Sequence, residues 1–272
     1  MSMVKRLFRA LLSRLRRACI VVVHFYSRKY VKKFDENICA SAVPQKFNSL
    51  QDQYMFFHHS FWNKAPLFVR EHRAYFRKEQ RGFGEDAFHS MWYELLKEFR
   101  PQHLLEIGVY RGQVLSLWAL IAKEQNISCH IHGISPFSSA GDAVSAYIDG
   151  IDYYNDVIAN FNHFLLPLPT LHRGFSTDSD MIKVIQSKKW DLIYIDGSHD
   201  FDVVKSDFSL CASMLSKRGL IILDDSAMFT EFAPPLYASS GHPGPSKLAP
   251  LITKKQFKEI LSVGHNRVFQ KT

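Results

Sequence analysis

Acidic side chains stand at the ends of two long apolar runs in this 272-residue chain. Asp196 follows residues 190–195, and Asp224 and Asp225 follow residues 220–223. A continuous apolar run is typical of a parallel strand that is buried on both faces. Ligands of open α/β sheets bind where such strands end. We therefore expect these three carboxylates to lie together on neighbouring strands.

Carboxylates gathered at one edge repel one another, and a hard divalent cation such as Mg²⁺ relieves that repulsion. A bound cation of this kind lowers the pKa of a hydroxyl group that it contacts. His199 lies three residues after Asp196, and an imidazole takes up a proton near neutral pH. The pattern predicts a metal site of Asp196, Asp224 and Asp225, with His199 and Asp196 as the catalytic pair and His199 as general base.

Each of these residues also has a purely structural interpretation. Asp196 can cap the helix that follows, because Asp is a favoured N-cap residue. Adjacent strand residues point to opposite faces, so Asp224 and Asp225 share one cleft only where the chain has left strand geometry. We therefore favour Asp196 with one member of the pair. His199 is alternatively a surface histidine or one that only supports the site, whereas we interpret His242 and His265 first as loop and turn residues.

A third apolar run leads into a loop with two glycines four residues apart. Residues 103–107 carry Glu106 near their end, Gly108 and Gly112 follow, and residues 113–123 are expected to be helical. Strand, tight turn and helix open a Rossmann-type unit, in which glycine permits close approach of a ligand and the helix N-terminus offers unpaired N–H groups. The spacing is a poor match to the dinucleotide fingerprint, and a βα turn without a cofactor is the alternative.

The loop from Glu106 to Gly112 resembles the first motif of class I S-adenosylmethionine (SAM) methyltransferases. Three further features follow in order: Ile-Asp-Gly-Ser-His at 195–199, Leu-Asp-Asp at 223–225, and a closing hairpin around 263–269. Together they resemble the type 24 methyltransferase family, which is similar to metal-dependent O-methyltransferases of the catechol kind and to macrolide-sugar O-methyltransferases. The resemblance covers roughly residues 85–272.

The resemblance implies a SAM site, with contacts from matching positions of the chain. The first loop would hold the methionine part of SAM through these residues: Glu106, Gly108, Tyr110 and Gly112. Ser176 would lie near the adenine, and Asp196 would serve both the cofactor and the metal. It also implies Asp196, Asp224 and Asp225 as metal ligands and His199 as the base.

One position departs from the family pattern. Ser135 stands where an acid usually holds the ribose hydroxyls, and a hydroxyl cannot offer the bidentate contact of a carboxylate. Asp142 is the nearby residue that can compensate.

The chain as a whole is predicted to be an α/β protein with the Rossmann-like class I methyltransferase fold, a mostly parallel twisted sheet with helices on both faces, a C-terminal antiparallel hairpin and an N-terminal helical extension. We expect strands at 103–107, 130–134, 170–173, 190–195 and 220–223, and a hairpin of 257–263 with 267–270. We expect helices at 86–99, 113–123, 143–166, 180–187, 203–215 and 247–252.

Three segments make up the predicted organisation: a basic arm (1–34), an aromatic-rich cap of short helices and loops over the mouth of the domain (35–84), and the methyltransferase domain (85–272). The aromatic side chains of the cap either pack on the sheet edge or line the substrate site.

The positive charge lies mostly in the arm. Residues 1–34 hold ten of the 34 Lys and Arg residues and no acid, which leaves 24 basic against 26 acidic residues elsewhere. We therefore expect no nucleic-acid partner for the domain. Residues 4–26 place apolar side chains on one helical face and arginines on the other, which indicates a helix for a membrane surface, for packing on this chain or a partner, or for mitochondrial targeting.

The uncharged run 18–27 is too short to cross a bilayer. The four scattered cysteines suit a reducing compartment and argue against a Cys-ligated zinc site. We expect a cytoplasmic protein, with peripheral attachment to a membrane surface through residues 4–26 as an option.

The predicted activity is SAM-dependent O-methylation of a hydroxyl on a small molecule or a sugar or glycan, assisted by Mg²⁺ or another divalent cation, in a monomer or a homo-oligomer. One alternative is a metal-independent methyltransferase whose acids bind cofactor or cap helices. The other is a non-catalytic SAM-binding protein tethered by its N-terminal helix, which Ser135 favours.

Overall fold

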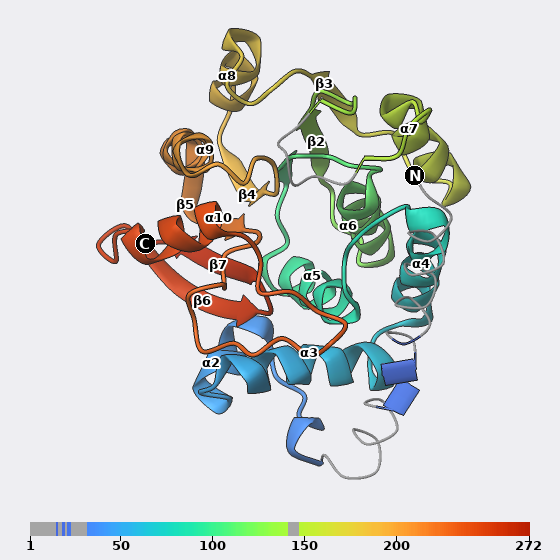
Figure 1. The fold of residues 1–272 in the computed structure, drawn as a ribbon, viewed down its shortest axis with the longest axis vertical. Coiled ribbons are helices and arrows are strands. Elements are labelled where there is room, and N and C mark those ends of the chain that lie inside the picture. Colours follow the sequence, from blue (N-terminus) through green and yellow to red (C-terminus); the bar gives the residue numbers. More distant parts are fainter. Residues whose placement is uncertain (1–14, 16–17, 20, 23–31, 141–146) are drawn as a thin grey trace.

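The computed structural model describes residues 15, 18, 19, 21, 22, 32–140 and 147–272. One seven-stranded sheet has the order β3-β2-β1-β4-β5-β7-β6 (Figure 1). The strands are β1 (His103–Ile107), β2 (His130–Ser135), β3 (Thr170–Arg173), β4 (Trp190–Ile195), β5 (Leu215–Leu223), β6 (Phe257–Val263) and β7 (Asn266–Lys271). β1 to β5 run parallel, and β7 pairs antiparallel with β5 and β6. The predicted parallel sheet with a closing antiparallel hairpin is confirmed.

Helices cover both faces of this sheet. The α-helices are α2 (Val43–Lys46), α3 (Leu50–Asn63), α4 (Leu67–Arg77), α5 (Asp86–Phe99), α6 (Gln113–Glu124), α7 (Tyr153–His163), α8 (Ser179–Gln186), α9 (Phe201–Met214) and α10 (Pro243–Leu248). Short 3₁₀ turns complete the set: η1 (Lys32–Phe34), η2 (Ala40–Ala42), η3 (Lys78–Gln80) and η4 (Ala249–Leu251).

The alternation of strand side chains builds two cores. Leu104, Leu192 and Ile222 face a core shared with α3, α5, α6 and α7. Leu105 and Ile193, one position along, face a core shared with α8, α9 and α10. Because successive strand residues point to opposite faces, the unbroken apolar runs of the sequence supply both cores at once.

β5 begins at Leu215, five residues before the strand expected at 220–223, and three further predicted elements differ from the structure. The helix expected at 143–166 begins only at Tyr153, where the Asp152 side chain accepts from the Asn155 amide and caps α7; residues 147–152 are not helical, and 141–146 lie outside the described residues. The helix expected at 247–252 begins earlier, with Pro243 in the first turn of α10, and ends as η4, since proline is well suited to a first turn.

The third difference lies in the aromatic-rich segment, which contains two substantial helices of 14 and 11 residues, α3 and α4. α3 packs against α5 and β6. Tyr54, Phe57 and Phe61 are buried in the same core as the central strands. The packing interpretation therefore holds for these three side chains, and the core of the sheet extends into residues 35–84.

Most of the predicted helix 4–26 lies outside the described residues. The five residues described there, at 15, 18, 19, 21 and 22, are helical, and Leu15 and Val22 are exposed. Within the described part of the chain, no helix is long and apolar enough to cross a membrane. All four cysteines are free thiols.

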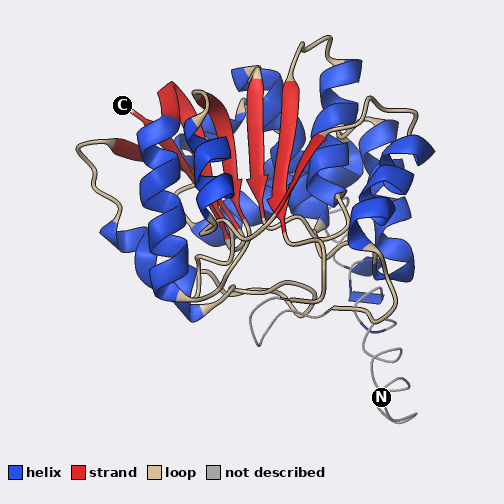
Figure 2. Ribbon diagram, turned by 90° about the horizontal axis from the view of Figure 1, so that it is seen from above, coloured by secondary structure: helices blue, strands red, loops and turns tan. Residues whose placement is uncertain are grey.

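The carboxyl ends of the parallel strands meet at one edge, where the loops gather (Figure 2). Backbone hydrogen bonds continue one step beyond the strands: the Gly108 amide donates to Ile134, the Asp196 amide to Ile107, and the Asp224 amide to Ile195, at 2.9, 2.8 and 3.0 Å. Gly108 has φ +101°, and a Cβ there would lie 1.9 Å from the Asp196 carbonyl oxygen. The first glycine thus lets the ends of β1 and β4 meet backbone to backbone.

Gly108→Ala tests this contact against Gly150→Ala, which shares a positive φ (+79°) but has open space around the added methyl group. Positive φ alone costs alanine about 1–2 kcal/mol, and the overlap with Asp196 adds about 1–3 kcal/mol at position 108. Urea unfolding of both variants should show the larger loss of stability for Gly108→Ala. Equal losses would contradict the proposed role of the close backbone approach.

Candidate active site

Three acids on neighbouring strands point to the same side of the sheet. Ile195 pairs with Leu223, so Asp196 and Asp224 follow side by side. Glu106 pairs with Tyr194 on the other flank of β4, two residues before Asp196 and therefore on the same face. Tyr194 belongs to the core beneath α5 and α6. The predicted gathering of Asp196 and Asp224 at one edge is what the structure shows.

Burial makes this group of acids electrostatically costly. It raises the pKa of Asp196 well above its usual value, and the nearby Asp224 carboxylate raises it further. Burial also raises the pKa of Asp224, against the opposing effect of His265. Glu106 is 3% exposed, and burial together with Asp224 raises its pKa to about 8. Such sites favour protons or cations.

Asp225 joins the same cluster because the chain leaves strand geometry there. Its φ is +50°, so the expected opposition of adjacent side chains does not apply, and both Asp224 and Asp225 take part. The His199 Nε2 atom donates to the Asp225 Oδ2 atom at 2.8 Å. Burial acts to raise the pKa of Asp225, but the hydrogen bond from His199 and the nearby imidazoles outweigh it and lower that pKa.

Two histidines that we interpreted as loop and turn residues belong to this cluster. The His265 Nε2 atom lies 3.5 Å from Asp224 Oδ1, and the His242 Nε2 atom lies 3.9 Å from Asp225 Oδ2. His265 occupies the β6–β7 turn. β7 runs antiparallel to both β5 and β6, so β6 has the same direction as β5. The turn that follows β6 must therefore lie at the carboxyl edge of the parallel strands. That topological argument was available from the predicted hairpin.

The cap of the following helix is Asp200, not Asp196. The Asp200 side chain accepts from the amides of Asp202 and Val203 at the start of α9. Asp196 instead lines a small cavity of about 10 Å³ together with His199, Asp224 and Asp225, which is room for about one water-sized or ion-sized occupant. Asp196 is therefore free of the capping role.

The glycine loop meets the acids from the other side. Gly112 has φ +75° and begins α6 without a side-chain cap, so the first amides of the helix suit an anionic group, and that of Leu115 interacts with the Glu106 carboxyl. Within the described residues, the Glu106 Oε2 atom is buried and has no hydrogen-bond partner. Tyr110 packs against Phe83 and Tyr153. An unpartnered carboxylate oxygen beside a glycine loop fits a cationic cofactor such as SAM.

Both serines that we predicted to contact the cofactor form hydrogen bonds within the protein. The Ser135 hydroxyl donates to the Val109 carbonyl at 2.9 Å, and the Ser176 hydroxyl donates to Asp207 at 3.0 Å. Asp142, the residue expected to compensate for Ser135, lies outside the described residues. Ser135 thus supports the loop after β1.

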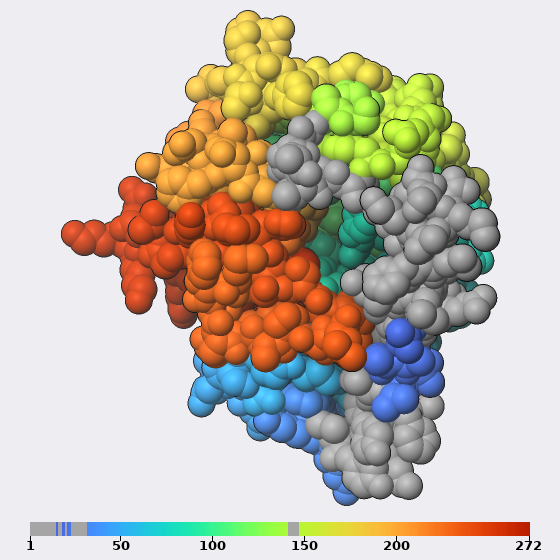
Figure 3. Space-filling view, in the orientation of Figure 1, coloured from blue at the N-terminus to red at the C-terminus, as the bar shows by residue number. Residues whose placement is uncertain are grey.

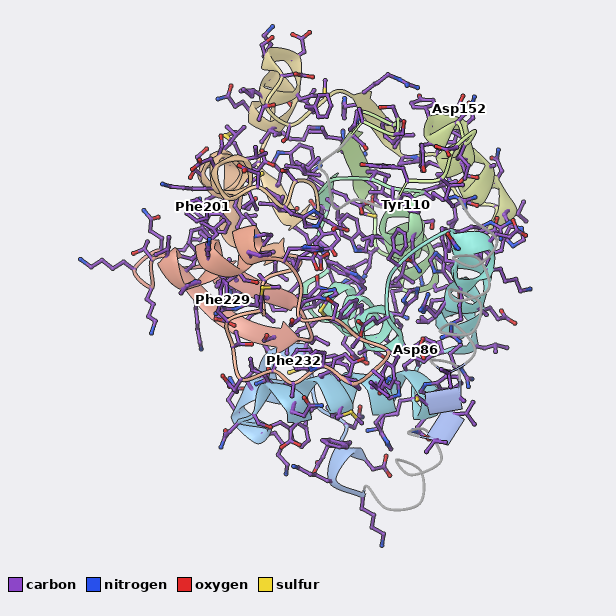
Figure 4. All side chains as sticks on the ribbon, viewed as in Figure 1. Asp86, Tyr110, Asp152, Phe201, Phe229 and Phe232 are labelled. Carbon is purple, nitrogen blue, oxygen red and sulfur yellow. The ribbon has the colours of Figure 1, made fainter. Side chains whose placement is uncertain are left out.

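The space-filling view shows a hollow on the face of the molecule that is turned toward the viewer (Figure 3). The orange segment that contains the loop after β5 borders it on one side, and the yellow-green segment before and within α7 borders it on another. Tyr110 and Phe229 lie on different sides of this region (Figure 4). Tyr110 comes from the glycine loop and Phe229 from the long loop after β5.

The raised pKa of Glu106 predicts a pH dependence of stability. A carboxyl with a folded-state pKa of about 8 holds its proton more tightly than in the unfolded chain. Its contribution to stability is therefore greatest at acid pH and falls as the pH rises from about 4.5 to about 8. Glu106→Gln should remove this component, so that urea unfolding without cofactor shows a smaller loss of stability from pH 5 to pH 8. Glu124→Gln, at the exposed end of α6, should behave like wild type; an unchanged slope for Glu106→Gln would contradict the assignment.

Comparisons with known proteins agree with this geometry. Residues 105–226 match the type 24 family model described as a methyltransferase domain. Among curated protein sequences, none matches the chain at a significant level.

Solved structures with a similar fold include a putative caffeoyl-CoA O-methyltransferase from Staphylococcus aureus (TM-score 0.53, 14% identity, 82% of this chain and 100% of that one). An O-methyltransferase from Bacillus cereus in complex with S-adenosylhomocysteine (SAH) has a TM-score of 0.53 at 12% identity, over 82% of this chain and 98% of that one. SAH-bound PaMTH1 of Podospora anserina has a TM-score of 0.52 at 15% identity, over 76% and 88%. The resemblance to class I, type 24 methyltransferases that the motifs indicated is thus confirmed, and it is carried by residues 105–226.

Proposed function

We propose that this protein is a SAM-dependent O-methyltransferase that acts on a hydroxyl group of a small molecule or a glycan, with a divalent cation at the carboxyl edge of its sheet. The observation that carries the proposal is the row of buried and partly buried acids on three adjacent strands, next to a glycine loop and a carboxylate-bound histidine. The matched methyltransferase domain supports it. Fold relatives named as O-methyltransferases, one of them with SAH, support the type of acceptor.

The glycine loop and Glu106 would hold SAM. The unpartnered Glu106 Oε2 atom suits the positive charge of the cofactor, and the start of α6 suits its carboxylate. When bound, SAM supplies an electrophilic methyl group on sulfur, and the protein contributes its orientation toward the acceptor oxygen.

Asp196, Asp224 and Asp225 would hold the cation. Burial and mutual repulsion disfavour bare negative charges on Asp196 and Asp224, so a divalent ion lowers the free energy of the site. The chemistry it supplies when bound is a lower pKa for the acceptor hydroxyl.

His199 would take the proton that the acceptor hydroxyl releases. Asp225 accepts the hydrogen bond from His199 Nε2, and a carboxylate in that place fixes the orientation of the ring and stabilises its protonated form. The catalytic pair expected from the sequence was His199 with Asp196; to it we add Asp225, which would position His199 through this hydrogen bond.

Asp196→Asn tests the catalytic cluster against Asp200→Asn as a matched control. Asn caps a helix as well as Asp does, so the control should keep its activity. Loss of the Asp196 charge should lower turnover about 100-fold or more, measured as SAH released from SAM with a panel of catechols, phenols and sugars. Full activity of Asp196→Asn on an accepted substrate would refute its role.

Withdrawal of the cation separates the proposal from a metal-independent enzyme. After treatment with EDTA, turnover should fall to background and return with added Mg²⁺ or Mn²⁺; undiminished turnover would eliminate the cation. Calorimetry with SAM and SAH addresses the non-catalytic alternative, which the engaged Ser135 hydroxyl favours: binding of SAM without turnover of any acceptor would support that alternative.

We also propose that the basic N-terminal helix contacts an anionic membrane surface, as its exposed Leu15 and Val22 side chains suggest. Deletion of residues 1–31, which spares the buried Phe34, should abolish co-sedimentation with vesicles that contain phosphatidylserine. Neutral phosphatidylcholine vesicles should bind the full chain weakly. Unchanged sedimentation after the deletion would disprove the attachment.

A further inference from the structure

His265 has the surroundings of a metal-binding histidine. Its Nδ1 atom lies 3.2 Å from the Ser239 carbonyl oxygen, which only accepts hydrogen bonds, so Nδ1 carries the proton and donates it. Its ring packs on Phe88 with 4.7 Å between centroids. Histidines that bind metals usually donate their second ring N–H to a carbonyl or carboxylate in this way. The other nitrogen, Nε2, faces Asp224, while Nδ1 also lies 3.7 Å from the Asp225 Oδ1 atom.

The partner of that nitrogen is an oxygen without a hydrogen bond. Asp224 Oδ1 is inaccessible to solvent and has no hydrogen-bond partner within the described residues, although His265 Nε2 lies 3.5 Å away. Two ligands that are each about 2.1 Å from one ion lie about 3–4.2 Å apart. Asp225 completes the set, since one ligand atom from each of Asp224, Asp225 and His265 lies within 4.8 Å of the others.

The backbone holds His265 in this place. Gly264 has φ +60°, and a Cβ there would lie 2.9 Å from the Phe88 ring, so glycine lets the β6–β7 turn approach α5 closely. The Ser226 amide donates to the His265 carbonyl at 2.8 Å, which ties the turn to the chain just after Asp225. The histidine and the two acids are therefore positioned by fixed backbone rather than by long side chains.

We propose that His265 is a nitrogen ligand of the divalent cation, together with Asp224 and Asp225, and that the site therefore prefers Mn²⁺, Fe²⁺, Co²⁺ or Zn²⁺ to Mg²⁺. Imidazole suits these ions, whereas Mg²⁺ prefers oxygen ligands alone. The inference rests on the proposed cation at this edge and adds its ligand and its chemical class. His199 remains the base rather than a ligand, because its Nε2 atom is hydrogen-bonded to the Asp225 Oδ2 atom.

Spectroscopy of bound Mn²⁺ tests the ligand directly, without an acceptor substrate. The chelator-treated full chain is titrated with Mn²⁺ and with Mg²⁺ by calorimetry, and the Mn²⁺ form is examined by pulsed electron paramagnetic resonance for coupling to an imidazole nitrogen. We expect Mn²⁺ to bind at least tenfold more tightly than Mg²⁺, with coupling to one nitrogen. His265→Gln should remove the coupling and weaken Mn²⁺ binding about tenfold or more, while Mg²⁺, which accepts an amide oxygen, changes little.

His242→Gln is the matched control, since the His242 Nε2 atom lies 3.9 Å from Asp225 Oδ2. This variant should keep the nitrogen coupling. Oxygen-only coordination in the wild type, or coupling that survives in His265→Gln, would overturn the inference and leave the proposed cation in place. Failure of any divalent ion to bind would overturn both. The wild-type spectrum decides the question even if His265→Gln does not fold.

Discussion

Like charges buried side by side are the constraint on which this structure depends. Glu106, Asp196 and Asp224 lie on three adjacent strands and face the same side of the sheet, because parallel pairing keeps residues of equal register on one face. Their burial raises the pKa of each carboxyl. Such an arrangement is stable only with protons, imidazolium groups or bound cations nearby. A cluster of this kind offers little to stability, which is why we interpret it as functional.

Close backbone contacts bring the remaining groups to these acids. Gly241 and Gly244 allow the loop before α10 to press on Asp225 and on the carbonyl of His199, where an added Cβ would lie 2.3 and 2.0 Å away. Ser246 donates to the Asp225 carbonyl at 3.0 Å. His242 therefore stands beside Asp225, and Asp225 itself departs from strand geometry with φ +50°. Rigid loops thus hold side chains that repel or attract one another strongly, as a preorganised site requires.

The helices before the sheet stabilise the same edge from one side. Tyr54 of α3 donates to the buried Glu85 at 2.7 Å, directly before α5. Burial raises the pKa of Glu85 to about 7, and His265 acts in the opposite direction. His72 of α4 lies 2.9 Å from the Ser116 hydroxyl, which donates to the Gly112 carbonyl. The aromatic-rich segment is thus connected by hydrogen bonds to Glu85 at the start of α5 and, through Ser116, to the glycine loop.

Much of the fold followed from local pattern. β4 appears where an apolar run indicated it, because a strand buried on both faces needs such a run. β1, β2, β3 and the closing hairpin also appear close to their expected positions. Asp196 and Asp224 could be placed together, since both follow strands of one parallel sheet. The predicted start of α7 was wrong. The apolar periodicity continued through Gly150, but the Asp152 side chain caps the helix and so determines where it begins.

By itself, the sequence determined which residue types stand at the strand ends, and hence the class of chemistry. Only the tertiary structure decided which further residues meet Asp196 and Asp224. The left-handed backbone of Asp225, the approach of His265 by way of the hairpin turn, and the cap at Asp200 in place of Asp196 all depend on contacts between segments far apart in the chain. Local propensity carries no information about such contacts, because they arise when strands pair and loops pack at the shared edge.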